Sequence, residues 1–387
     1  MVDPSESNSA ESVATSSYLD SISAYGKAGV PEAPVFADPE HDAAFRRDGY
    51  IILPLLNEEE VAELLKLHST FNPNQQSEFD TTIFNPDPSY RTGVRVEIDR
   101  IVQPRALPLL ANYKRAVSNF INKRHETKNA RVWIHQDYTF VDQSRYSGVH
   151  VWIPLVDVDE TNGCMSIYPG THSLINHISA QPYQSYQCFP NPYENVSQML
   201  EKGGAVAAPM KAGYGLFFNE RTLHSSGENY TGIDRVVVNC AYIPEDEPMY
   251  LYAPSPEEDG VLDMVELLDI SFLHLMHQKP LPVPYPDAFK LVGTVNYKPT
   301  MLTQDDIKHM LRPGYVHVHE VEDPNAPNWH SDHTISVETV SAAPTPIEVA
   351  SPVAEPAAVA VAEPVAVATA APASKPSWIR KLFGRGN

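Results

Sequence analysis

Residues 148–170, GVHVWIPLVDVDETNGCMSIYPG, contain two short runs of β-forming residues separated by turn signals. Asn162-Gly163 and Pro169-Gly170 predict tight turns, because these residue pairs favour the backbone conformations that turns require. Similar β-rich runs are RVWIHQDYTF (131–140), GAVAAPMKAGYGLFFN (204–219) and RVVVNCAYIP (235–244). Many short strands with frequent turn signals predict a sandwich or jelly roll rather than a parallel α/β sheet.

Helices are predicted on both sides of this β-rich region. A short helix and a strand at Tyr50–Leu53 precede Asn57, which caps a helix and has Glu60 three positions on, the pattern of a capping box. Apolar residues at helical spacing predict a further helix from Leu107 to about Lys123. Two more helices are predicted after the β region, within residues 260–277 and 303–311. The predicted fold class is mainly β with flanking helices.

The overall composition limits the classes of function. The formal net charge of -21 and a pI of about 5.0 argue against a nucleic-acid or anionic-membrane binder. Three cysteines are too few for a disulfide framework. No signal peptide and no integral membrane segment are visible, so we expect a cytoplasmic protein.

Shifts in composition predict four segments. Residues 1–37 are polar and small and predict a disordered arm, and residues 38–332 form the main domain. Residues 333–373 are rich in Ala, Pro and Val, which predicts an extended linker. Residues 374–387 end in SWIRKLFGRGN, a basic amphipathic tail. This tail would dock to a partner or touch a membrane surface weakly; a solvated tail is the alternative.

His135 and Asp137 occupy positions i and i+2 of a predicted strand, so both side chains would project from one face. With 15 His and 49 acidic residues, roughly two His-x-Asp/Glu matches are expected by chance. The second match, His330-Ser331-Asp332, lacks a β context. A site at the first match therefore needs further support from elsewhere in the chain.

That support comes from two residues on a later β segment. A mononuclear non-haem iron site needs two histidines and one carboxylate, with positions left open. His224 is a downstream histidine in a β context and supplies the missing donor. Arg235 opens the apolar run VVVNCAY, where a guanidinium is costly to bury unless it meets an anion such as a carboxylate.

Together the motifs resemble the phytanoyl-CoA dioxygenase family of Fe(II)- and 2-oxoglutarate-dependent oxygenases. They are HQD (135–137), HVWIPLVDVDETNGCMSIYPGTH (150–172) and GLFFNERTLHSSGENYTGIDR (215–235). The resemblance covers about residues 131–244 and extends more loosely to GYIILPLL and the helix after it. It implies a double-stranded β-helix, a cupin-like jelly roll.

The resemblance also implies roles for individual residues. Iron would be held by His135, Asp137 and His224, and Arg235 would bind the distal carboxylate of 2-oxoglutarate. The cosubstrate would be lined by Gln136, Trp152 and Ser226. For Trp152 a plain core position is the alternative, and His150 would face either the cavity or the core.

The implied activity is that of a dioxygenase using Fe(II), 2-oxoglutarate and O2 to hydroxylate an unactivated C–H bond, with release of succinate and CO2. Related halogenases have a small residue in place of the carboxylate, so Asp137 favours hydroxylation. Two alternatives are a non-catalytic jelly-roll binding protein and a zinc-type metal hydrolase. The substrate would be a small organic molecule. Four residues near the ligands could line its pocket, with core or surface roles as the alternative: Trp133, Tyr138, Arg145 and Tyr146.

Overall fold

The computed structural model describes residues 33–72, 77–128, 130–175, 178–180, 192–268, 286–297 and 301–307. The chain divides into two units, residues 1–324 and 325–387, and every described residue lies in the first. The predicted linker, the predicted tail and His330-Ser331-Asp332 lie outside the described residues, as does most of the predicted arm. Within the described part of the chain, no helix is long and apolar enough to cross a membrane.

Helices and strands alternate at first, and strands then dominate. The helices are α2 (Pro39–Asp48), α3 (Glu58–Phe71), α4 (Pro88–Ala106), α5 (Thr171–Leu174), α6 (Ser197–Gly203) and α7 (Gln304–Ile307). The strands are β1 (Tyr50–Pro54), β2 (Phe79–Thr81), β3 (Tyr113–Lys123), β4 (Val132–His135), β5 (Val149–Pro154), β6 (Met165–Ile167), β7 (Val206–Ala208), β8 (Tyr214–Asn219), β9 (His224–Ser226), β10 (Arg235–Pro244), β11 (Tyr250–Pro254), β12 (Val261–Leu267) and β13 (Phe289–Asn296).

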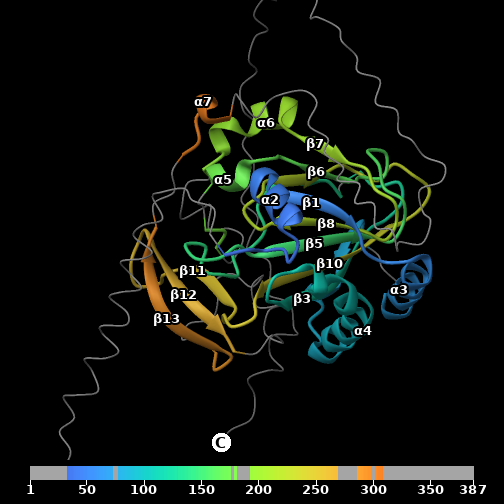
Figure 1. The fold of residues 1–387 in the computed structure, drawn as a ribbon, viewed down its shortest axis with the longest axis horizontal. Coiled ribbons are helices and arrows are strands. Elements are labelled where there is room, and N and C mark those ends of the chain that lie inside the picture. The colour runs from blue at the N-terminus through green and yellow to red at the C-terminus, as the bar shows by residue number, and fades with distance from the viewer. Residues whose placement is uncertain are drawn as a thin grey trace, which may run out of the picture. The chain divides into compact units, whose positions relative to one another are not determined.

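Two antiparallel sheets form the centre of the fold. The larger has the strand order β1-β8-β5-β10-β3-β2, and the smaller has the order β4-β9-β6-β7. From β3 to β10 the chain passes repeatedly between them, so that β3, β5, β8 and β10 lie in the larger sheet and β4, β6, β7 and β9 in the smaller (Figure 1). This topology is a jelly roll, and it confirms the predicted fold class.

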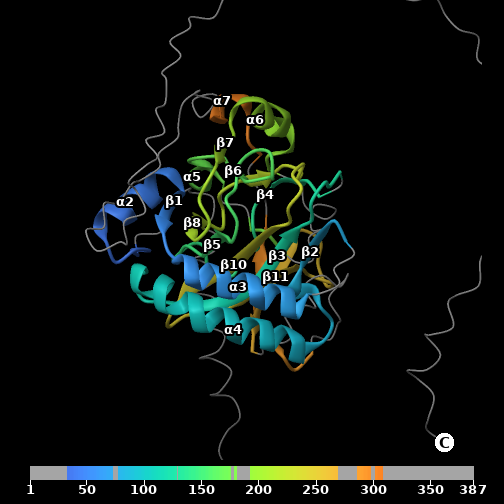
Figure 2. The same ribbon diagram turned by 90° about the vertical axis from the view of Figure 1, so that its right-hand side faces the viewer.

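The larger sheet is buried on both faces. Figure 2 shows α3 and α4 side by side along it. On β5, Val149, Val151 and Ile153 pack into the core that these helices complete. Trp152 packs into a second core with Met165 and Ile167 of the smaller sheet, between the two sheets. Alternate residues of β5 therefore face the helices and the interior of the roll, and His150 shares the interior face with Trp152.

Two predicted helices are strands. Residues 113–123 form β3, and the preceding helix is α4, which begins earlier, at Pro88 after the N-cap Asp87. Residues 261–267 form β12, the middle strand of a third sheet, β11-β12-β13. Both strands are buried over most of their length, so apolar residues stand on both faces and their spacing imitates that of a helix.

Other local predictions are confirmed. The strand at Tyr50–Leu53 is within β1, and α3 begins with the full capping box of Asn57 and Glu60. The positive φ angles of Gly163 (76°) and Gly170 (79°) fit the predicted turns. Of the helix predicted within 303–311, α7 covers the described part.

Candidate metal centre

His135, Asp137 and His224 lie together in the interior of the jelly roll. β4 ends at His135 and β9 begins at His224, and the two residues are paired across these strands. One donor atom from each of the three side chains lies within 4.8 Å of the others. Oδ1 of Asp137 is 3.8 Å from Nε2 of His135 and 3.7 Å from Nε2 of His224. The fold thus brings together the predicted ligands, although Asp137 lies just past the end of β4.

The ring orientation of both histidines is set by main-chain carbonyls. Nδ1 of His135 lies 2.7 Å from the carbonyl of Trp133, and Nδ1 of His224 lies 3.0 Å from the carbonyl of Thr222. Because a carbonyl only accepts, Nδ1 is the donor in each of these contacts, and Nε2 of each ring faces Asp137. Burial, followed by the neighbouring His135, lowers the pKa of His224 to about 3. Imidazoles oriented in this way are typical metal ligands.

The loop between β8 and β9 positions His224. The side chain of Asn219 accepts from the main-chain N–H of Arg221 at 3.0 Å, and the N–H of Thr222 donates to the carbonyl of Asn219 at 2.8 Å. The hydroxyl of Thr171 accepts from the N–H of Leu223 at 2.9 Å. These contacts fix the turn and join it to α5, and they place His224 at the start of β9 in the smaller sheet.

Asp137 has a second imidazole neighbour that the sequence left open. Nδ1 of His150 lies 2.9 Å from Oδ2 of Asp137, so His150 faces the site. Burial raises the pKa of Asp137, but His150, His224 and His135 together hold it below its usual value. Asp137 is therefore an ionised carboxylate, as a divalent metal requires. Two imidazoles and one carboxylate suit a divalent transition metal such as iron.

Arg235 is a buried cation without a carboxylate partner. Its side chain is 1% exposed, Nη1 donates to the carbonyl of Gly163 at 3.2 Å, and the guanidinium lies 5.2 Å from the ring centroid of Trp152. Among the described residues no carboxylate oxygen lies within 4.0 Å of it. Burial lowers the pKa of Arg235 to about 9, which leaves it charged at neutral pH. A buried charge without an ionic partner is costly, so the surroundings of Arg235 favour an anionic ligand.

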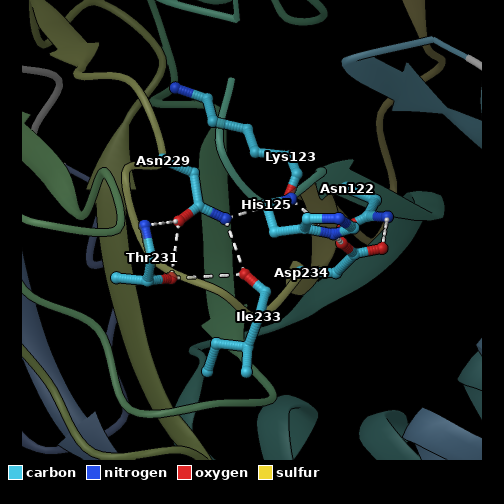
Figure 3. Close-up of polar contacts among 7 residues, drawn as sticks. All are labelled: Asn122, Lys123, His125, Asn229, Thr231, Ile233 and Asp234. Carbon is cyan, nitrogen blue, oxygen red and sulfur yellow. Dashed lines mark hydrogen bonds and ion pairs between the residues drawn. The ribbon is translucent and has the colours of Figure 1, made fainter. Parts of the chain in front are cut away.

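The neighbouring Asp234 is not the missing partner. Its carboxylate lies 2.7 Å from Nδ1 of His125 and 3.3 Å from the side-chain amide of Asn122. Figure 3 shows these contacts beside Asn229, whose amide donates to the carbonyls of Lys123 at 3.2 Å and Ile233 at 2.8 Å. This network fixes the turn that leads into β10, where Arg235 begins the strand.

Lys123 is a second buried basic residue at this place, and sequence reasoning missed it. It is paired with Arg235 across β3 and β10. Nζ donates to Oγ of Ser226 at 2.7 Å and also to the carbonyl of Gly227. Burial first, and then Arg235, lower the pKa of Lys123 to about 6. The available signal was a lysine at the end of the apolar run AVSNFINK (116–123), whose partner only the strand pairing reveals.

The three residues predicted to line the cosubstrate, Trp152, Ser226 and Gln136, contact different groups in the structure. Trp152 lies against Arg235, and Ser226 accepts from Lys123, so each contacts one of the two buried basic residues. Gln136 is buried, and its Nε2 donates to the carbonyl of Arg221 at 2.8 Å, on the loop before His224.

The predicted pocket residues are less well supported. Trp133 is 64% exposed, with the guanidinium of Arg131 lying 4.4 Å from its ring centroid, so it does not line an interior pocket. Arg145 forms an ion pair with Glu247 at 3.4 Å. Tyr138 and Tyr146 are half-buried against the core formed with β11 and β12. The exposure of Trp133 fits the surface role, which the sequence left open beside the pocket role.

The family model described as "Phytanoyl-CoA dioxygenase (PhyH)" matches residues 45–237, which include the whole ligand set and Arg235. The chain belongs to this family. The peroxisomal phytanoyl-CoA dioxygenase of Rattus norvegicus is 26% identical over 154 residues, 38% of this chain and 45% of that protein. The protein of the same name from Homo sapiens is 26% identical over 130 residues, 33% of this chain and 38% of that protein. The alignments thus span less than half of these relatives.

The chain is also similar to several solved structures. The α-ketoglutarate-dependent epimerase SnoN from nogalamycin biosynthesis has a TM-score of 0.38 at 23% identity, with 54% of this chain and 83% of that chain covered. The carbocyclase SnoK has 0.41 at 20% identity, with 68% and 99% covered. EctD from S. alaskensis with bound Fe has 0.40 at 18% identity, with 57% and 85% covered.

Proposed function

We propose that this protein is an Fe(II)- and 2-oxoglutarate-dependent dioxygenase that hydroxylates an unactivated C–H bond of a small organic substrate, with release of succinate and CO2. One observation carries the proposal. The histidine and aspartate donors converge in the same interior that holds Arg235, a buried cation without a carboxylate partner among the described residues. A metal and a dicarboxylate cosubstrate would satisfy both features at once.

In this proposal the three donors hold the metal through Nε2 of His135, Oδ1 of Asp137 and Nε2 of His224. When bound, iron and 2-oxoglutarate supply the chemistry that activates dioxygen. Arg235 and Lys123 bind the distal carboxylate and orient the cosubstrate along the pocket. Because the pocket is buried, these charges act in a medium of low dielectric and strengthen that contact.

The wall of the pocket contributes shape and exclusion of water. The ring of Trp152 makes a cation–π contact with the guanidinium of Arg235. This contact orients the guanidinium but leaves its positive charge available to an anion. Ser226 holds Lys123 in place, and its hydroxyl also has capacity to donate to the cosubstrate. We assign Gln136 to the boundary between this pocket and the loop that carries His224.

Asp137 favours hydroxylation over halogenation, because its carboxylate occupies the position where a halide would need space. The substrate is proposed only as a small organic molecule. A cytoplasmic location, the four-segment organisation, and docking to a partner or membrane surface through residues 374–387 stay predictions.

Anaerobic addition of Fe(II) and 2-oxoglutarate to the apo protein is the direct test. We expect a visible metal-to-ligand charge-transfer band, followed on admission of O2 by succinate release that a substrate panel would stimulate. A protein that develops no band, or whose band persists unchanged after His135→Ala, would be a binding protein or a metal hydrolase instead.

Proton uptake on cosubstrate binding is expected from Lys123. Its pKa of about 6 makes it mostly neutral in the free protein above that pH. A bound carboxylate favours the ammonium form, so binding takes up a proton and affinity falls as pH rises above about 6, by up to roughly tenfold per unit. Calorimetric titration with 2-oxoglutarate in buffers of different ionisation enthalpy measures this uptake.

Lys123→Met should remove the proton uptake and flatten the pH dependence of affinity. Lys114→Met is the matched control, since Lys114 lies on the same strand and donates to the carbonyl of Glu245 at 2.6 Å, away from the pocket. Equal proton uptake in Lys123→Met and in the unchanged protein would remove Lys123 from the binding site.

A further inference from the structure

His150 is held rigidly beside the carboxylate of the candidate metal centre. It stands on β5, on the strand face directed to the interior, and is 5% exposed. Its ring stacks on Phe140 with a centroid distance of 5.9 Å and an interplanar angle of 21°, and it lies 5.6 Å from the ring of Phe218. Aromatic packing on two sides leaves the imidazole little freedom to rotate.

The two oxygens of Asp137 have different neighbours. Oδ1 faces Nε2 of His135 and Nε2 of His224, at 3.8 and 3.7 Å. Oδ2 faces Nδ1 of His150 at 2.9 Å. An ionised carboxylate only accepts, so in this short polar contact the hydrogen would be on Nδ1 of His150. One oxygen thus faces the two candidate metal ligands, and the other faces His150.

We propose that His150 is a positioning residue that restricts Asp137 to monodentate coordination through Oδ1. The inference rests on the proposed function. With one donor from each of three side chains, about three positions of an octahedral ion remain for cosubstrate and dioxygen. A bidentate Asp137 would occupy one of them and compete with chelation by 2-oxoglutarate. The short polar contact with His150 would prevent this by holding Oδ2 away from the ion.

Two substitutions separate the hydrogen bond from the packing. His150→Phe keeps an aromatic ring between Phe140 and Phe218 but has no donor. His150→Gln keeps a donor that reaches toward Oδ2. Loss of a residue that orients a metal ligand typically costs about 10- to 100-fold in metal affinity or activity. We expect His150→Phe to bind 2-oxoglutarate at least about 10-fold more weakly at saturating Fe(II), and His150→Gln to restore most of the affinity.

The readouts do not depend on turnover. The anaerobic charge-transfer band, titrated with 2-oxoglutarate at saturating Fe(II), gives the cosubstrate affinity, and Co(II) titration gives the metal affinity. If His150→Phe forms the band with the affinity of the unchanged protein, the proposal is wrong. If the unchanged protein forms no band at all, the proposed function fails instead, so the two failures are distinguishable.

A measurement on the unchanged protein covers the case in which His150→Phe does not fold. In infrared difference spectra of metal-loaded minus apo protein, the separation of the antisymmetric and symmetric carboxylate stretches distinguishes monodentate from bidentate binding. Loss of the difference bands in Asp137→Asn assigns them to this residue. We expect the wide separation of a monodentate carboxylate; the narrow separation of a bidentate one would overturn the role of His150.

Discussion

Replacing His224 by alanine is expected to lower kcat/KM by on the order of 10³-fold or more, together with loss of tight Fe(II) binding. His224 supplies a neutral Nε2 from a buried ring whose Nδ1 is fixed by the carbonyl of Thr222. Only two protein ligands, His135 and Asp137, would then hold the ion, so its affinity would fall. Equilibrium titration with Fe(II) or Co(II), followed by assay of succinate release, measures both effects.

His172→Gln is the control for removal of a buried histidine. His172 is fully buried, and its Nε2 lies 3.0 Å from the carbonyl of Arg46, so it has a contact of its own outside the metal centre. Burial also lowers the pKa of His172 to about 4. We expect this variant to lose some thermal stability but to bind Fe(II) normally. Equal metal affinity in His224→Ala and the unchanged protein would rule out the ligand role.

Arg235→Met is expected to have opposite effects on binding and on stability. Removing one partner of a buried charge pair typically costs about 2–5 kcal/mol, so 2-oxoglutarate should bind on the order of 10²-fold more weakly. In the protein without cosubstrate, however, Arg235 is a buried charge with no carboxylate within 4.0 Å among the described residues. Methionine removes its desolvation cost, so the apo protein should be more stable by about 1–4 kcal/mol.

Thermal unfolding with and without 2-oxoglutarate checks both signs in one experiment. We expect Arg235→Met to unfold at a higher temperature than the unchanged apo protein and to show no further rise on adding 2-oxoglutarate. Arg105→Met, at an exposed arginine paired with Glu60 at 2.9 Å, should keep the full ligand-induced rise. A variant of Arg235 that loses stability but keeps that rise would place the carboxylate elsewhere.

Local signals accounted for much of the fold. The capping box of Asn57 and Glu60 acts within one turn of helix, and it correctly marked the start of α3. The paired turn residues, such as Asn162-Gly163, correctly separated short strands. For residues 113–123 the apolar spacing predicts a helix, and this prediction is wrong. Because α4 and the interior of the roll cover opposite faces of β3, the alternation that marks a strand is lost.

The candidate site residues could be predicted from sequence, because each is a polar or charged residue of a type that is unusual in a β-rich segment. His135, Asp137, His224 and Arg235 interrupt apolar strands or the turns between them, where a polar or charged group needs a specific partner. The partner contacts themselves were not accessible. Nothing in the spacing of Lys123 and Arg235, or of His150 and Asp137, indicates that each pair meets.

The sequence by itself determined the class of fold and the chemical type of the site, since strand length, turn residues and side-chain chemistry are properties of short segments. Tertiary structure decided which charges share one interior. The pairing of β3 with β10 placed Lys123 opposite Arg235. The interior face of β5 placed His150 against Asp137. Strand pairing joins residues that are distant in sequence, and its register depends on the packing of whole sheets, which no local pattern encodes.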